Sequence, residues 1–180
     1  MARVTDISEA RIAFQVAGSD ADRLLVSRYR GTEGLSQLYR FELDLVAEGE
    51  DIVLDDIVGR QAALTVHATH GERWVHGLVS RFEHVGETQR QRYFRADLVP
   101  SLWLLAQRYQ SRIFQNKTTL QIIAEVLERA GFTSDYLKAD LRQRSDYRER
   151  EYCVQYRETD LNFFSRLLED EGITYFFQHA

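Results

Sequence analysis

The hydrophobic pattern of this chain changes its period close to Pro100, the only proline in 180 residues. Before that point apolar and polar residues mostly alternate, most clearly where Phe41, Leu43 and Leu45 share one face. Such alternation is typical of half-buried antiparallel strands. The same pattern, in places weaker, predicts strands over residues 13–16, 24–30, 39–47, 62–68, 73–85 and 92–99. The first hundred residues are therefore expected to form mainly β-structure.

The strand predicted over 73–85 is long and contains Gly77. A polar turn at 69–72 connects it to the preceding strand, so the two are expected to form a hairpin. A glycine inside a long strand commonly marks a bend or bulge, which lets a sheet curl on itself. Because closure removes the exposed edges of a flat sheet, we predict that residues 1–100 form a curved antiparallel β-barrel.

Beyond Pro100 the apolar residues take a helical spacing. A short helical segment is expected over 101–108, and a clear helix over 118–130, where Thr118 and Gln121 form a capping box. Further predictions are a strand over 152–157, a helix over 160–171 capped by Thr159, and the start of a strand over 173–177. Residues 101–180 are thus predicted to be a mixed α/β segment with two helices, which makes the chain a β-rich α+β protein. Because the last predicted strand lacks a partner, we expect a fragment of a longer protein, or else a short product that relies on association to cover that edge.

Charge and composition disfavour several classes of partner. The formal net charge is −5, and the arginines at 142, 144, 148 and 150 alternate with acidic residues, so no positive field attracts nucleic acid or anionic lipid. The single cysteine, Cys153, can form neither an internal disulfide nor a cysteine-based zinc cage. The N-terminal residues lack a secretory signal, and no segment is long enough to span a membrane. We expect synthesis in the cytoplasm, no stable membrane insertion, and export only by a machine that needs no leader.

Several segments carry a family resemblance when taken in order along the chain. They are His76-Gly77-Leu78-Val79, residues 98–105, Ser111-Arg112-Ile113-Phe114-Gln115, residues 150–160, Phe164 and residues 166–177. Together they resemble the N-terminal region of VgrG, the spike family of the bacterial type VI secretion system, which is similar to the hub proteins of contractile phage tails. The resemblance extends from about residue 20 to the end of the chain.

This resemblance implies a phage-tail-hub-like structural protein and no enzyme. In such a family member, barrel domains of a homotrimer form a collar that caps the hexameric Hcp tube and docks to baseplate components for effector delivery, with effectors or adaptors as further partners. The resemblance implies no catalytic residue and no cofactor. It also implies assembly in the cytoplasm followed by passage through the type VI machine out of the cell or into a target cell. The alternative is the hub of a phage tail or of an extracellular contractile injection particle.

The histidines and the single cysteine are the residues to consider for a metal site or a nucleophile. His67, His70, His76 and His84 surround one predicted hairpin, and clustered imidazoles are raw material for a metal site. The turn separates them and no carboxylate recurs at matching spacing, so we favour no metal site and a packed strand position for His76. Cys153 alternates with apolar strand neighbours and is expected to pack as a small apolar residue. No nucleophile elbow, phosphate-binding loop or zinc-protease helix occurs in the sequence.

The acidic end of the second predicted helix is the one candidate site. Glu169, Asp170 and Glu171 crowd the negative end of the helix dipole, at a cost of about 0.3–1 kcal/mol each when exposed. We hypothesise that arginines, with Arg148 and Arg150 as first candidates, pair with them within the subunit or across a subunit boundary. Arginine makes up 21 of the 23 basic residues and favours planar protein contacts, although a GC-rich genome explains this bias equally well. The alternative is that solvent screening makes the cost small.

Two other function classes have definite requirements. A cell-wall hydrolase needs a pocket with two carboxylates at glycosidase separation. A small module that binds carbohydrate or nucleic acid needs an exposed aromatic platform, such as Trp74 beside Tyr93.

Overall fold

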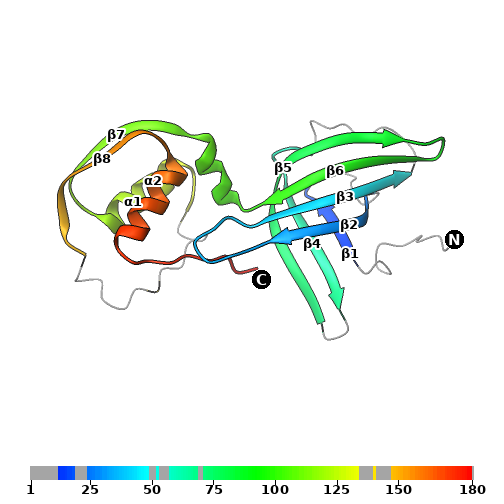
Figure 1. Cartoon of the computed structure of the whole chain (residues 1–180), viewed down its shortest axis with the longest axis horizontal. Coiled ribbons are helices and arrows are strands. Elements are labelled where there is room, and N and C mark those ends of the chain that lie inside the picture. Colours follow the sequence, from blue (N-terminus) through cyan, green and yellow to red (C-terminus); the bar gives the residue numbers. More distant parts are fainter. Residues whose placement is uncertain are drawn as a thin grey trace. The chain divides into compact units, whose positions relative to one another are not determined.

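The computed structural model describes residues 12–18, 24–48, 52, 57–68, 71–133, 140 and 147–179. They divide into two compact units (Figure 1). The barrel unit runs to Ser101 and also includes the described residues from Phe176 onward, and the α/β unit covers Leu102–Tyr175. No helix in the described part of the chain has the length and apolar character needed to cross a membrane.

The barrel unit is a closed antiparallel barrel with the strand order β1-β2-β3-β6-β5-β4. The strands are β1 (Ile12–Val16), β2 (Leu25–Thr32), β3 (Arg40–Glu48), β4 (Gln61–Ala68), β5 (Gly71–Glu87) and β6 (Gln91–Val99). The alternation predicted for β3 is confirmed, because Phe41, Leu43 and Leu45 are buried in the barrel core. The predicted fold class, a β-rich α+β chain with an antiparallel barrel, is correct.

Barrel closure depends on β5, which changes its partner at Leu78. Residues 71–78 pair with β4, and the rest of the strand pairs with β6 from Leu78↔Val99 onward. A Cβ at Gly77 would overlap the backbone carbonyl of Val99 and the hydroxyl of Tyr39. Glycine is therefore required at position 77 because another backbone approaches it closely.

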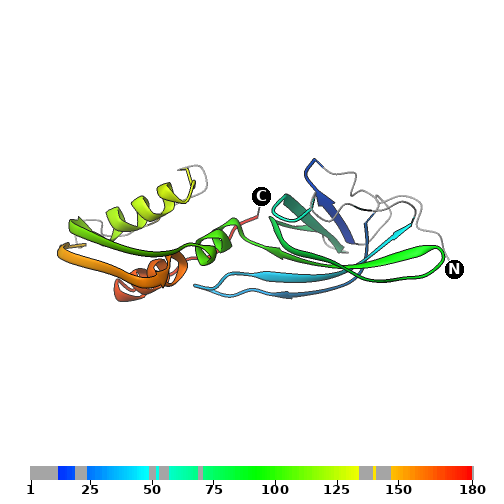
Figure 2. The same cartoon turned by 90° about the horizontal axis from the view of Figure 1, so that it is seen from above.

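The α/β unit contains one two-stranded antiparallel sheet and two α-helices. Its elements are η4 (a 3-10 helix, Ser101–Gln107), β7 (Tyr109–Thr118), α1 (Thr119–Arg129), β8 (Glu149–Thr159) and α2 (Asp160–Asp170). β7 and β8 run side by side along one curve (Figure 2). The inward side chains of this sheet, Phe114 and Cys153, share a core with Ile122 of α1 and with Phe163 and Leu167 of α2.

Both helix starts follow the sequence signals. Thr118 accepts a hydrogen bond from the Gln121 amide, and the Gln121 side chain accepts one from the Thr118 amide, which completes the capping box. Thr159 caps α2 by accepting from the Asn162 amide at 3.1 Å. Each of these bonds satisfies an amide that would otherwise lack a partner at a helix N-terminus.

Two strand assignments from the sequence differ from the structure. β7 was not predicted, because its inward positions include Arg112 as well as Phe114 and the apolar alternation is weak. The strand expected over 173–177 is wrong, since residues 173–179 form neither helix nor strand. Two of its aromatic side chains make packing contacts, whereas Phe176 is exposed. Phe177 lies edge-on to Tyr39, and Tyr175 lies edge-on to Phe164.

Candidate interaction surface

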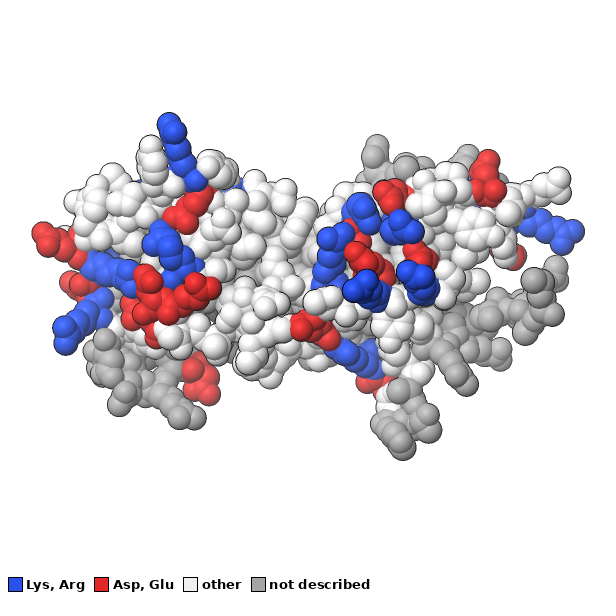
Figure 3. Space-filling view, viewed as in Figure 1, with Lys and Arg blue, Asp and Glu red and all other residues white. Residues whose placement is uncertain are grey.

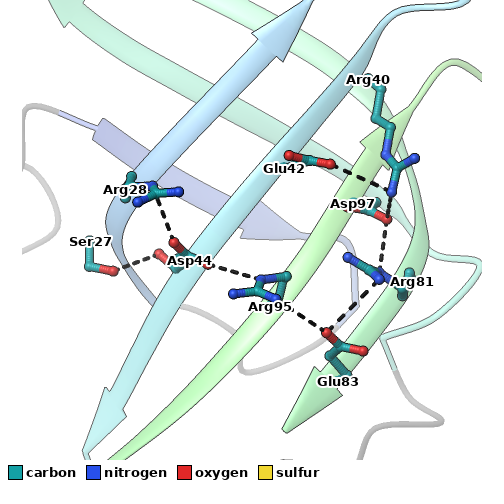
Figure 4. A network of polar contacts seen from close by, with 9 residues as sticks. All are labelled: Ser27, Arg28, Arg40, Glu42, Asp44, Arg81, Glu83, Arg95 and Asp97. Carbon is teal, nitrogen blue, oxygen red and sulfur yellow. Dashed lines mark hydrogen bonds and ion pairs between the residues drawn. The ribbon is translucent and has the colours of Figure 1, made fainter. Parts of the chain in front are cut away.

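The outer face of β2, β3, β6 and β5 carries a network of alternating charges (Figure 4). Asp44 of β3 accepts from Arg95 Nε of β6 at 3.1 Å and forms an ion pair with Arg28 of β2 at 3.4 Å. Glu83 of β5 continues the network, with one carboxylate oxygen 3.9 Å from Arg95 and 4.0 Å from Arg81. The network therefore joins four neighbouring strands of the barrel.

Asp97 is the buried centre of this network. Its side chain is 4% exposed and its Oδ2 lies 2.7 Å from Arg40 and 2.9 Å from Arg81. The two guanidinium groups remain about half exposed, at 51% and 43%. Glu42 also contacts Arg40, at 3.7 Å. A buried carboxylate is tolerated only when paired and hydrogen-bonded, so the two arginines are held in place by Asp97.

Basic and acidic side chains gather side by side on this face of the barrel (Figure 3). Because the opposite charges alternate at close range, their fields largely cancel beyond about one Debye length of 8–10 Å. The face offers short-range paired contacts and no extended positive field of the kind that binds a phosphate backbone. The sequence predicted the outward direction of these side chains on β3 and β6, but not their pairing across four strands.

A second buried acid, Asp160 of α2, connects this helix to β7, to β8 and to Arg108, which lies between η4 and β7. It is the first residue of α2 and fully buried. Its carboxylate forms an ion pair with Arg108 at 3.0 Å and accepts hydrogen bonds from Arg112 of β7, at 3.1 Å to each oxygen, and from Gln155 of β8 at 2.8 Å. Its backbone amide also donates to the carbonyl of Arg108 at 2.8 Å. Sequence reasoning missed this cluster, and the only signal was an acid in the first turn of a helix.

The predicted acidic end lies at the C-terminus of α2, and Arg150 of β8 reaches it. Arg150 contacts Glu171 at 2.9 Å and Asp170 at 3.4 Å. Thr119 of α1 donates a hydrogen bond to the same Glu171 oxygen at 2.6 Å. The Thr119 hydroxyl and then the Arg150 guanidinium hold the pKa of the Glu171 carboxyl below its ordinary value.

The remaining two candidates of this set point elsewhere. Arg148 and Glu169 are both exposed. Within the described part of the chain, neither side chain forms an ion pair with the other candidates. The structure thus brings Arg150, Asp170 and Glu171 together within one chain. A role of the five residues at a subunit boundary stays a prediction.

The outer face of the β7–β8 sheet exposes large apolar side chains, among polar ones such as Ser111 and Gln115. Its large apolar side chains are Tyr109, Ile113, Tyr152, Val154 and Tyr156, which are between 37% and 67% exposed. Ile113 and Val154 are directly opposite each other in the ladder. Monomeric proteins rarely leave a contiguous apolar patch of this kind uncovered, so it is a candidate contact surface.

The histidines do not converge in the part of the chain that the structure describes. His67 pairs with Glu72 at 3.0 Å, and His84 lies edge-on to Phe94. His76 is exposed and stacks on Trp74 with ring centroids 6.1 Å apart, so the expectation of a packed strand position is only partly right. His70 lies outside the described residues. No group of three or more histidine, cysteine or acidic residues suited to a metal ion occurs among those described.

Cys153 packs as predicted, whereas Trp74 and Tyr93 do not lie side by side. Cys153 is buried in the sheet, and burial raises the pKa of its thiol. It therefore packs as a small apolar residue, as expected. Trp74 and Tyr93 do not form a platform, because Trp74 lies in the first half of β5 opposite Thr65, whereas Tyr93 pairs with Gly86 near the other end of β5. Arg142 and Arg144 lie outside the described residues.

The barrel and the α/β unit together correspond to a known protein family. Residues 32–180 match the family model of the phage tail baseplate hub (GPD). The chain belongs to this hub family. The type VI secretion system spike protein VgrG1a of Pseudomonas aeruginosa is 42% identical over 159 residues, which are 88% of this chain and 24% of that protein. The chain thus spans about a quarter or less of the length of the curated relatives it matches.

Solved structures agree with the hub fold. An E. coli protein, described as a component of the type VI secretion system with structural similarity to bacteriophage tail proteins, matches 93% of this chain and 45% of its own with a TM-score of 0.76 and 26% identity. The 43 kDa tail protein of a Shewanella oneidensis prophage matches 91% of the chain with a TM-score of 0.59 and 16% identity. The second likeness shows the fold alone: a phage tail protein has the same kind of barrel and α/β architecture.

Proposed function

We propose that this chain is the hub portion of a type VI secretion spike, a structural part that assembles as a homotrimer and caps the Hcp tube. The observation that carries the proposal is the 42% identity to a spike protein over 88% of the chain. The hub of a phage tail or extracellular injection particle is less favoured, because the phage-derived structure shares the fold at only 16% identity.

The geometry supports a mechanical role. In the closed barrel ring each strand pairs with two neighbouring strands over part of its length, and the cross-strand charge network ties four of the strands together on the outer face. In the α/β unit the buried Asp160 cluster fixes β7, β8 and α2 to one another and to Arg108, the residue that follows η4. Both devices resist deformation without any reacting group, which suits a collar that transmits load and does no bond-making chemistry.

Three surfaces are available for the contacts of such a hub. The charge network of the barrel is suited to a paired polar interface, and the apolar β7–β8 face to a contact that excludes water. The third is the acidic end of α2, where Arg148 and Glu169 are proposed to contact a neighbouring subunit while Arg150 neutralises Asp170 and Glu171 internally. In the assembled parent, contacts with baseplate components and with effectors or adaptors, and export through the type VI machine, are part of the same proposal.

The test is a chimeric spike. The N-terminal quarter of VgrG1a is replaced by this chain in a Pseudomonas aeruginosa strain lacking its own spike genes, and Hcp release into the medium is measured. We expect the chimera to restore release, and a matched chimera with Ile113→Asp and Tyr156→Asp on the β7–β8 face to reduce it at equal protein level. A stable, trimeric first chimera that releases no Hcp would overturn the proposal.

A further inference from the structure

The residues that follow the α/β unit, 176–179, pack on the barrel unit beside one edge of β5. Residues 71–78 of β5 pair with β4 on one side, whereas pairing with β6 begins only at Leu78. Among the described residues, the stretch from Gly71 to Gly77 therefore has a second edge that no strand covers. An uncovered strand edge exposes unpaired amide and carbonyl groups, which proteins normally protect.

Two side chains protect this edge at His76. The Tyr39 hydroxyl donates to the His76 carbonyl, and the His76 amide donates to Nδ1 of His179 at 3.1 Å. In an antiparallel strand the amide and carbonyl of one residue point to the same edge, so both bonds lie on the open side of β5. Because Nδ1 of His179 accepts a hydrogen bond, the ring must be neutral with its proton on Nε2.

Aromatic contacts complete the attachment. The Phe177 ring lies edge-on to Tyr39 at 5.1 Å between centroids and packs against the barrel core. The His179 ring lies 5.1 Å from the same tyrosine and 6.3 Å from the His76 ring. Residues 176–179 are thus held by three ring contacts and by one hydrogen bond that exists only while His179 is neutral.

We propose that residues 176–179 form a pH-sensitive strap, which closes the open edge of β5 while His179 is neutral and releases when His179 is protonated. Protonation places a hydrogen on Nδ1, directly opposite the amide hydrogen of His76. The bond is then lost and two donors face each other.

The surroundings of His179 favour its neutral form. Burial is the largest cause and lowers the pKa of His179, and the neighbouring His76 and Arg73 lower it further. Glu33 opposes them, but it is paired with Arg73. Burial also raises the pKa of Tyr39, so its hydroxyl keeps the proton that it donates to His76. Docking is therefore fully present above the ordinary histidine pKa of about 6.5 and weakens as the pH falls toward the lower pKa of the docked ring.

The test follows single sites by NMR in the ¹⁵N-labelled 180-residue chain between pH 8 and pH 5. Hydrogen exchange of the His76 amide reports docking, and the imidazole nitrogen shifts of His179 report its tautomer and titration. We expect the Nε2–H tautomer at pH 8 and a His179 pKa below the ordinary histidine value of about 6.5. Protection of the His76 amide is expected to fall about tenfold per pH unit between the undocked and docked pKa values of His179.

The matched variants are His179→Asn, whose carbonyl accepts but does not titrate, and His179→Ala, which has no acceptor. We expect protection of the His76 amide to be independent of pH in the first and low at every pH in the second. Loss of protection at the core residue Leu64 together with His76 would mean general unfolding and would overturn the strap. An Nδ1–H tautomer at pH 8, or protection that stays constant while His179 titrates, would overturn it as well.

Discussion

Substitution of Asp160 by asparagine should destabilise the α/β unit far more than a surface charge change does. The carboxylate is fully buried, forms ion pairs with Arg108 and Arg112, and accepts a hydrogen bond from Gln155. Arg112 is itself only 12% exposed, so removal of the negative charge leaves a nearly buried guanidinium without its counter-charge. Breaking a buried pair by removing one partner costs about 3–5 kcal/mol. With a urea dependence of about 2 kcal/mol per molar, the unfolding midpoint should fall by about 2 M.

The measurement is urea unfolding followed by tryptophan fluorescence in a Trp74→Phe background, where Trp103 of the α/β unit is the only tryptophan. The matched control is Glu158→Gln, which removes a partly exposed partner of Arg166 and should cost about 0–1 kcal/mol. The double change Asp160→Asn with Arg112→Met should recover part of the loss, because no unpaired charge remains at Arg112. A loss for Asp160→Asn no larger than that of the control would refute the reasoning.

Three further outcomes are expected. Gly77→Ala should destabilise the barrel by about 1–3 kcal/mol through overpacking, whereas Gly86→Ala, with open space around its Cβ, should not, and equal thermal shifts would contradict this. Because the pKa of Glu171 is lowered in the folded chain, its carboxylate stabilises the fold at pH values above the ordinary pKa of 4.5. This contribution is lost as the pH falls through the folded-state pKa. Glu171→Gln should therefore flatten the acid limb of the stability curve, and an unchanged limb would count against the Arg150 and Thr119 contacts. The Cys153 thiol should react with a thiol reagent about tenfold or more slowly in the native chain than in urea, since it is buried and its pKa is raised; equal rates would contradict its packing.

The candidate site was only partly accessible from sequence. The acidic run at the end of α2 could be read directly, because a helix end and its dipole are local features, and Arg150 was a sound candidate partner for it. The pairing of Asp97 with Arg40 and Arg81 could not be predicted from the sequence. These residues come from three strands, and local sequence patterns do not specify the order of the strands in the barrel. The same holds for Asp160, whose partners lie on β7 and β8.

The sequence by itself determined the local elements of this hub domain. Three features depend only on neighbours within a few residues, so the sequence predicted them. They are the alternation in β3 and β6, the capping box at Thr118 and the cap at Thr159. Tertiary structure decided the rest. β7 is a strand because β8 pairs with it, whereas residues 173–177 have no strand partner and place Tyr175 and Phe177 in packing contacts instead. Strand pairing and side-chain burial depend on contacts between segments that are distant in sequence. Only the three-dimensional structure shows which segments meet.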